Sequence, residues 1–331
     1  MKKLRLVTIA LSLVLILSFA LTACTQANVD EELEIKITVL NGTTGFGMAK
    51  LMNDAREDKA TLNYNVNVDT DAANIQAALI NGSIDIAALP TNAAAALYNK
   101  TGGKIKIAAV NTLGVLYLMT NTHELEITDI KQLRGMKVYA PAQNPAFILE
   151  AILRANGLTP GKDVTIDTAY AQPADLRAAL VSGKIDVAIL PEPMVTTAIR
   201  ANSDLAVGLD ITSEWEKAYG KNTLIQGCIV VRTEWAEAHP KELEQFLKDY
   251  EASINFTRKS PKDASELIVV NGIMQGDKTI VETAIPRCNI IYMDADDNIA
   301  KSLDKFYNTL YQINPKAVGG KVPDSGIYFG K

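Results

Sequence analysis

Polar residues at the predicted starts of helices are the part of this sequence best suited to binding a small molecule. They follow short apolar runs in both halves of the chain, and they are Thr43, Thr44, Gly45, Thr91, Asn92, Gln143 and Asn144. The first N–H groups of a helix have no partner inside the helix, and the helix dipole favours an anionic group there. The sequence therefore predicts donors aimed at a polar ligand, although Thr and Asn are also ordinary helix caps.

Apolar contacts must add to these polar ones. Each helix end contributes about 0.3 to 1 kcal/mol, whereas micromolar binding needs roughly 8 kcal/mol. Phe46 and Tyr139 are placed to supply apolar contact, with a core-facing Tyr139 as the alternative. Asn111 and Gln226 complete the predicted ligand-binding set.

The charge of the predicted site leaves the ligand class open. No Arg or Lys lies in the loops 41–47, 89–92, 141–145 and 190–193, so a strongly anionic ligand would lack a bidentate partner. Glu192 follows Pro191 at the end of an apolar run. If Glu192 lines the site, it favours an amine or an amino-bearing heterocycle. Otherwise it is an exposed carboxylate at a helix start, stabilised by the dipole.

Motifs for catalysis or metal binding are absent from the sequence. It contains no nucleophile elbow, phosphate-binding loop, HExxH or paired-Cys motif. Its two histidines, His123 and His239, lie away from the predicted ligand loops. We therefore expect no catalytic residue, no metal and no cofactor.

The N-terminus carries a predicted export and lipidation signal. Lys2, Lys3 and Arg5 precede an uncharged stretch that ends in the lipobox-like run LTAC at 21–24. This pattern predicts a signal peptide over residues 1–23, a lipidated Cys24 and a polar tether over 24–32, with a permanent transmembrane anchor as the alternative. Export would also permit a disulfide between the other two cysteines, Cys228 and Cys288, which are otherwise two buried thiols.

An internal repeat indicates the elements that position these residues. AALINGSIDIAALP at 77–90 recurs as AALVSGKIDVAILP at 178–191, with nine identities in fourteen positions. Each copy predicts a helix that ends at a glycine, Gly82 or Gly183, and then a short buried strand that ends at a proline. Alternating helices and strands predict an α/β fold in two similar halves. Loops at the carboxyl ends of both sets of strands would face a shared crevice, which suits closure around a ligand.

Composition agrees with an exported globular protein. The chain has 331 residues, of which 48% are hydrophobic and 21% charged, and its net charge is −5. This composition is not that of a disordered chain, and the acidic balance offers no basic stripe for nucleic acid. Removal of residues 1–23 takes away three basic residues and no acidic one, which leaves a net charge of −8.

Several segments together resemble the solute-binding proteins of ABC transporters in the nitrate/sulfonate/taurine group. They are GTTGFGMAKLM at 42–52, GSIDIAALPTN at 82–92, AVNTLGVLYL at 109–118, LRGMKVYAP at 133–141, GKIDVAILPEP at 183–193, GCIVVR at 227–232 and NPKAVGGKVPD at 314–324. The resemblance implies a type II periplasmic-binding-protein fold with two Rossmann-like lobes and a two-crossover hinge. Lobe 1 would comprise 33–121 and 223–331, and lobe 2 would comprise 122–222.

The resemblance also implies a function and partners. We expect an extracytoplasmic lipoprotein, monomeric and held at the outer face of the cytoplasmic membrane. It would capture a sulfonate, taurine or nitrate-type solute and deliver it to permease subunits with a cytoplasmic ATPase. A pyrimidine-type thiamine precursor is the alternative ligand. A less favoured alternative is an enzyme like the thiamine-pyrimidine synthases of the same group, which use pyridoxal phosphate.

Overall fold

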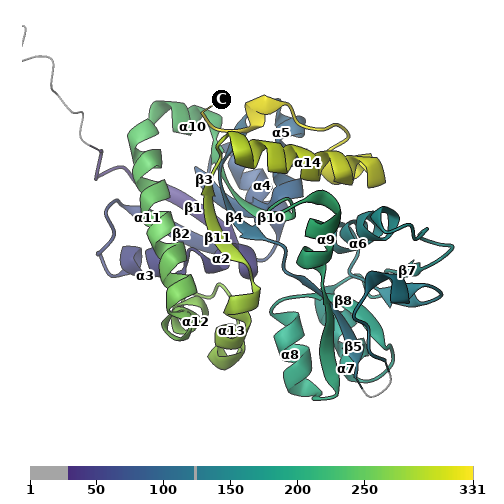
Figure 1. Ribbon diagram of the computed structural model, residues 1–331. Coiled ribbons are helices and arrows are strands. Elements are labelled where there is room, and N and C mark those ends of the chain that lie inside the picture. Colours follow the sequence, from purple (N-terminus) through teal and green to yellow (C-terminus); the bar gives the residue numbers. More distant parts are fainter. Residues whose placement is uncertain (1–28, 123–124, 331) are drawn as a thin grey trace, which may run out of the picture.

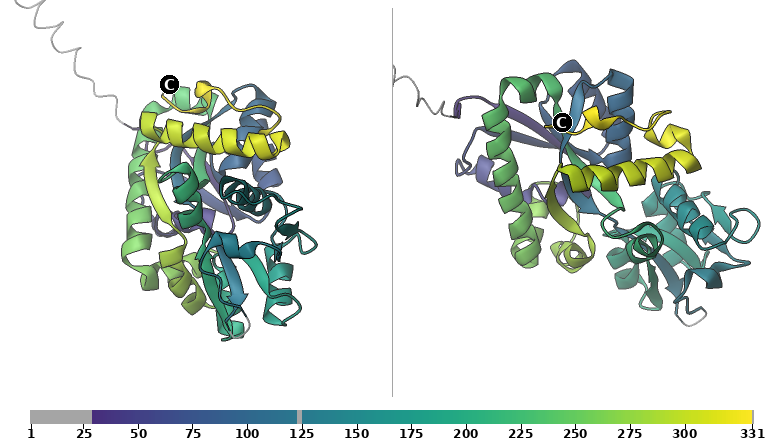
Figure 2. Two further views of the ribbon diagram at one scale, coloured as in Figure 1. Left: turned by 45° about the vertical axis from the view of Figure 1, so that its right-hand side comes forward. Right: turned by 45° about the horizontal axis from the view of Figure 1, so that its top comes forward.

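Two mixed β-sheets with helices packed around them make up the chain (Figure 1). The computed structural model describes residues 29–122 and 125–330. Within these residues, sheet 1 has the order β11-β4-β10-β3-β1-β2 and sheet 2 the order β7-β6-β8-β5-β9. We call the part built on sheet 1 lobe 1 and the part built on sheet 2 lobe 2. The right-hand view of Figure 2 shows the mostly teal lobe 2 beside lobe 1, whose elements run from purple and blue to green and yellow.

The elements follow one another as the alternating pattern predicted. The strands of sheet 1 are β1 (Ile35–Leu40), β2 (Tyr64–Asp69), β3 (Ile86–Pro90), β4 (Ile105–Leu113), β10 (Ile225–Arg232) and β11 (Ile290–Asp294). Those of sheet 2 are β5 (Leu116–Asn121), β6 (Lys137–Tyr139), β7 (Thr165–Asp167), β8 (Val187–Pro191) and β9 (Leu205–Asp210). The helices up to the second crossover are α2 (Thr43–Phe46), α3 (Ala49–Arg56), α4 (Ala72–Asn81), α5 (Thr91–Thr101), η1 (Ile130–Leu133), α6 (Asn144–Ala155), α7 (Pro173–Val181), α8 (Met194–Ala201) and α9 (Ile211–Tyr219). Those after it are α10 (Thr233–Ala238), α11 (Pro240–Lys259), α12 (Pro261–Val270), α13 (Lys278–Ala284), η2 (Ile285–Arg287), α14 (Asp297–Ile313), η3 (Pro315–Val318) and η4 (Ser325–Ile327).

The internal repeat forms the same unit in both lobes. Helix α4 ends at Gly82 with φ 78°, and the glycine after α7, Gly183, has φ 70°, a left-handed conformation in which a β-carbon is unfavourable. Strands β3 and β8 follow, and their first four residues are buried because helices cover both faces of each sheet. Each is parallel to a neighbouring strand of its own sheet, β1 or β6.

The first crossover lies earlier than the predicted boundary at 121. Strand β5 (Leu116–Asn121) is hydrogen-bonded between β8 and β9 in sheet 2, so it belongs to lobe 2. The chain crosses at Gly114 and Val115. A β-carbon at Gly114 would lie 2.2 Å from Thr212 Oγ1 and 2.6 Å from Leu224 Cδ2, so this close passage requires glycine. The chain returns to lobe 1 ahead of β10, which starts at Ile225.

A shared core joins the two lobes. One cluster of buried apolar residues takes members from both sheets. Within it Trp215 of α9 lies edge-on to Phe306 of α14, with 5.7 Å between ring centroids, and α14 also contacts α6. Lobe 2 is therefore packed against the last long helix of lobe 1.

The predicted tether is partly folded. Residues 1–28, which include the predicted signal peptide and Cys24, lie outside the described residues. The Asp30 amide donates to the buried Glu242 carboxylate at 2.8 Å, and Val29 and Leu33 pack on the core of lobe 1. The folded part of the chain therefore begins by residue 29, before the expected end of the tether at residue 32. No helix within residues 29–122 and 125–330 combines the length and apolarity needed to cross a bilayer.

Candidate functional site

The starts of helices α5 and α6 meet across the boundary between the lobes. Asn144 Nδ2, at the beginning of α6, donates to Asn92 Oδ1, at the beginning of α5, at 3.1 Å. Each helix follows a strand of its own sheet, β3 in lobe 1 and β6 in lobe 2. The structure therefore brings together two amide side chains that the sequence separates by 52 positions.

A groove with a volume of about 370 Å³ opens at this junction. We call it the interlobe groove, and its lining residues are Gln76, Asn92, Ala93, Ala96, Gln143, Phe147, Asn314, Lys316 and Ala317. Among these described residues there are four amides, one cation and no carboxylate. Alanine and phenylalanine side chains supply an apolar wall. Such a lining suits a small molecule with a polar or singly anionic head and an apolar tail.

Gln143 is strained at the mouth of this groove. It is exposed and has φ 70° and ψ −124°, while its carbonyl accepts the Phe147 amide at 3.1 Å. A positive φ in a non-glycine residue costs of the order of 1–3 kcal/mol, and such residues cluster at functional sites. The strain agrees with the predicted ligand-binding role of Gln143.

Four of the predicted ligand residues are buried in the core of lobe 1 instead. Phe46 and Thr91 are 0% exposed and Asn111 is 1% exposed, so none of the three offers open surface in this structure, and their contact with a ligand stays a prediction. A β-carbon at the buried Gly45 would lie 2.7 Å from Leu40 O and 2.9 Å from Ile273 Cγ2. Glycine at position 45 thus lets the α2 turn pack closely, which is a structural requirement.

Asn111 and Gln226 hold the backbone around the site. Asn111 Nδ2 donates to Thr44 O at 3.1 Å and to Tyr250 Oη at 2.9 Å. Gln226 is half-buried, and its Oε1 accepts the amide of the crossover residue Val115 at 2.8 Å. Both side chains satisfy buried backbone groups, so we interpret them as positioning residues.

Thr43, Thr44 and Tyr139 are half-buried. The two threonines lie in α2, a single turn, and so short a helix carries little of the dipole that the sequence prediction invoked. The ring of Tyr139 lies 5.9 Å from that of Tyr170 and 5.6 Å from Lys137 Nζ. This environment fits the alternative that Tyr139 packs within lobe 2.

Glu192 forms an ion pair between the lobes. Its side chain is 0% exposed, and Oε1 accepts from Arg287 Nε of lobe 1 at 2.6 Å. The Thr196 amide donates to Oε2 at 3.1 Å, and Arg287 Nη2 donates to Thr196 Oγ1 at 2.8 Å. The alternative of an exposed carboxylate is therefore wrong. Since Arg287 compensates the charge, Glu192 gives no support for an amine-type ligand.

Arg287 and Lys316 are functional candidates that the sequence reasoning missed. Arg287 is 95 positions from Glu192 and lies in η2, outside every predicted loop. Tyr117 Oη donates to the Arg287 carbonyl at 2.8 Å, and burial raises the pKa of Tyr117, so this donor stays protonated. Lys316 lies in the run NPKAVGGKVPD at 314–324, but nothing in the spacing of this run indicates that it approaches Asn92.

The candidate disulfide is not formed. Cys228 and Cys288 are both free and buried. Cys228 Sγ donates to Leu89 O at 3.7 Å, and Cys288 Sγ donates to Ala284 O at 3.2 Å. Burial raises the pKa of Cys228 to about 12 and raises that of Cys288 as well.

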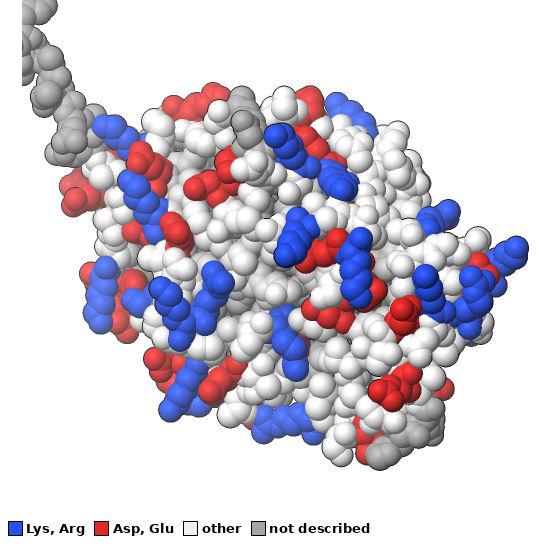
Figure 3. Space-filling model, in the orientation of Figure 1, with Lys and Arg blue, Asp and Glu red and all other residues white. Residues whose placement is uncertain are grey.

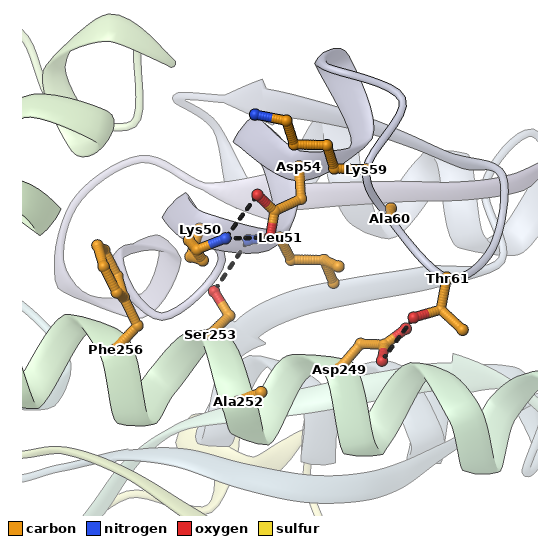
Figure 4. Close-up of a pocket in the computed structure, with 10 residues that line it drawn as sticks. All are labelled: Lys50, Leu51, Asp54, Lys59, Ala60, Thr61, Asp249, Ala252, Ser253 and Phe256. Atoms are coloured by element: carbon orange, nitrogen blue, oxygen red, sulfur yellow. Dashed lines mark hydrogen bonds and ion pairs between the residues drawn. The ribbon is translucent and has the colours of Figure 1, made fainter.

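A second pocket, of about 160 Å³, lies between α3 and α11 on lobe 1 (Figure 4). Its charged side chains already have partners. Lys50 is paired with Asp54, Lys59 with Glu57, and Asp249 accepts from Thr61 Oγ1 at 3.2 Å. Residues of lobe 2 do not line it. The interlobe groove is therefore the better candidate for a ligand.

Charges of both signs are interspersed over the face shown in Figure 3, without a broad area of one sign. Across the described ranges no group of three His, Cys, Asp or Glu side chains could hold a metal ion.

Comparisons with known proteins agree with this arrangement. A family model described as the periplasmic substrate-binding protein of a phosphonate ABC transporter matches residues 52–275. A Bacillus subtilis (strain 168) protein assigned as an aliphatic sulfonates-binding protein is 25% identical over 197 residues, which are 59% of this chain. The match spans 55% of the length of that relative.

Solved structures confirm the predicted periplasmic-binding-protein fold. The crystal structure of an ABC transporter from Parabacteroides distasonis is 27% identical, with a TM-score of 0.75 over 91% of this chain and 100% of that one. The aliphatic sulphonate-binding protein SsuA from Escherichia coli is 17% identical, with a TM-score of 0.69 over 90% and 94%. The alkanesulfonate-binding SsuA from Xanthomonas axonopodis pv. citri, solved with MOPS bound, is 13% identical, with a TM-score of 0.61 over 87% and 94%.

Proposed function

Because this chain belongs to the family of periplasmic substrate-binding proteins of phosphonate ABC transporters, we propose that it captures a small alkanesulfonate in the interlobe groove. The observation that carries the proposal is the lining of the groove. Among the described lining residues, amides from both lobes and one lysine face an apolar wall, and no carboxylate opposes an anion. A sulfonate brings one negative charge and an alkyl chain, which matches one cation beside alanine and phenylalanine side chains.

The rest of the proposed function concerns transport. The protein binds its solute outside the cytoplasm as a monomer that is anchored to the membrane through a lipidated Cys24. It delivers the solute to permease subunits that a cytoplasmic ATPase drives. It acts without a cofactor and catalyses no reaction. Binding favours the closed arrangement of the lobes only as far as the ligand binds that arrangement more tightly than an open one.

A thermal-shift screen tests the ligand class. Mature protein carrying Cys24→Ser is heated with alkanesulfonates, taurine, nitrate, alkylphosphonates, pyrimidines and amino acids. A ligand at 100 times its Kd adds about 2.7 kcal/mol of stability, which raises the Tm of a chain this size by several degrees. We expect alkanesulfonates to give the largest rise. A rise in Tm with pyrimidines alone would rule out the proposed ligand. So would a Tm that rises with none of the compounds.

Replacement of the amide that links the lobes should weaken binding. Asn144→Ala removes the hydrogen bond that holds the groove residue Asn92 at the junction of α5 and α6, and we expect the Kd for the best alkanesulfonate to increase about fivefold, as for loss of a neutral hydrogen bond. Isothermal titration calorimetry measures the change. Asn156→Ala, at the opposite end of α6, is the matched control and should leave the Kd unchanged. Equal effects of the two substitutions would show that Asn144 acts only through helix stability.

A further inference from the structure

The segment after α14, residues 314–329, is hydrogen-bonded to side chains of α5. Asn99 Nδ2 donates to Val318 O at 2.8 Å and to Lys321 O at 2.7 Å. Further along, Tyr98 Oη donates to Asp324 Oδ1 at 2.6 Å. The Phe329 amide donates to Ile107 O of β4 at 2.9 Å. The segment is therefore held along its length by side chains of α5 and by the sheet.

The turn η3 (Pro315–Val318) presses against α5 at one wall of the interlobe groove. Asn314 Oδ1 accepts the Lys316 amide at 3.0 Å and so fixes the start of the turn. The turn ends at Gly319 with φ 81°, where a β-carbon would lie only 2.7 Å from Ala96 Cα. Ala96 lines the groove, so this close approach places η3 at its edge.

Lys316 is presented into the groove by this turn. Its side chain is exposed, and it forms no ion pair with any other residue in the described ranges. Among the described lining residues it is also the only charged one. Its backbone is fixed, and no carboxylate of the described lining competes for its ammonium group, which can therefore form charge-assisted hydrogen bonds with an anionic ligand.

We infer that Lys316, delivered by the C-terminal segment, is the residue that selects an anionic ligand over a neutral one of the same shape; this inference rests on the proposed alkanesulfonate function. The ammonium group of Lys316 donates to the sulfonate oxygens. The amides of the groove complete the hydrogen bonds, and the alkyl chain lies against Phe147 and the alanines of α5. The predicted ligand loops contain no Arg or Lys. The positive charge for the ligand thus comes from a segment more than 100 residues further along the chain.

Calorimetric titrations of butanesulfonate and of the neutral, nearly isosteric butanesulfonamide into the mature Cys24→Ser protein test this inference, because loss of the Lys316 charge should weaken binding of the first and leave that of the second unchanged. We expect Lys316→Gln to weaken butanesulfonate binding about tenfold, as for loss of a hydrogen bond to a charged group. Lys316→Arg should stay within about threefold of wild type, since it keeps the charge. The matched control is Lys321→Gln, because Lys321 lies in the same segment and loses the same charge, but it does not line the groove. It should bind as wild type.

The salt dependence gives a readout that a purely structural role would not change. An exposed cation is screened by salt, so butanesulfonate binding to wild type should weaken as NaCl is raised, and binding to Lys316→Gln should respond much less. Two results would overturn the inference while the proposed function stands. One is a Lys316→Gln protein that binds butanesulfonate with the affinity and salt dependence of wild type. The other is an equal loss of butanesulfonate affinity in Lys316→Gln and Lys321→Gln. If wild type itself binds no alkanesulfonate, the proposed function fails and the inference fails with it.

Discussion

Arg287→Met is expected to lower the free energy of unfolding by about 3 kcal/mol. Removal of one partner from a buried ion pair costs about 3–5 kcal/mol, because the other charge stays in the interior uncompensated. The Glu192 side chain is 0% exposed, and its remaining partner is Thr196. Arg287 itself is 36% exposed, which places the expected cost at the lower end of the range. Urea denaturation followed by circular dichroism gives the change.

Two further variants separate the charge from the packing. Glu192→Gln combined with Arg287→Met removes both charges, and it should recover most of the lost stability. A second ion pair, Arg200 with Asp277, crosses the same boundary between α8 and α13 at 2.9 Å, but its side chains are 55% and 44% exposed. Arg200→Gln should therefore cost less than about 1 kcal/mol. An Arg287→Met variant no less stable than Arg200→Gln would contradict the prediction.

Trp215→Ala is expected to cost about 3–5 kcal/mol and to separate the unfolding of the two lobes. Such a cost is usual when a large buried side chain is cut back to Ala. The ring of Trp215 is 0% exposed, lies against Phe306 of lobe 1 and against Tyr219, and donates from Nε1 to Thr223 Oγ1 at 3.0 Å. Since this contact joins the cores of the lobes, its loss should replace one cooperative calorimetric transition with two.

Trp235 supplies a matched control for this experiment. It is 5% exposed and lies in α10, within the core of lobe 1 alone. Trp235→Ala removes the same ring, but it should lower the Tm of the whole protein without separating the lobes. A single transition in Trp215→Ala would show that other contacts, such as those between α14 and α6, are enough to couple the lobes.

The repeat made the fold predictable from sequence, because its signals are local. Gly82 and Gly183 mark helix ends, and the apolar runs after them can be satisfied only by buried strands. The crossover was placed too late because β5 (Leu116–Asn121) reads equally well as a strand of either lobe. Its membership is decided by pairing with β8 and β9, about 70 to 90 residues further along the chain.

The candidate site was predictable only in part for the same reason. Asn92 follows the carboxyl end of β3 in sheet 1, and Gln143 and Asn144 follow that of β6 in sheet 2. Ligands bind beyond such strand ends in α/β sheets, a rule that applies without coordinates. Phe46 follows such a strand too, but its direction depends on the packing of α2 against the core, which periodicity over one turn does not fix. Arg287 and Lys316 come from segments whose positions are set by tertiary contacts, so no local pattern indicated them.

The two buried thiols make this chain a convenient background for fluorescent labelling. Maleimide reacts with the thiolate, and with a pKa of about 12 the Cys228 thiolate is almost absent at neutral pH, while burial also blocks the reagent. A Cys24→Ser protein with one introduced exposed cysteine on each lobe should therefore take a donor and an acceptor dye without removal of either native thiol. The distance between the lobes could then be followed in single molecules while solute is added.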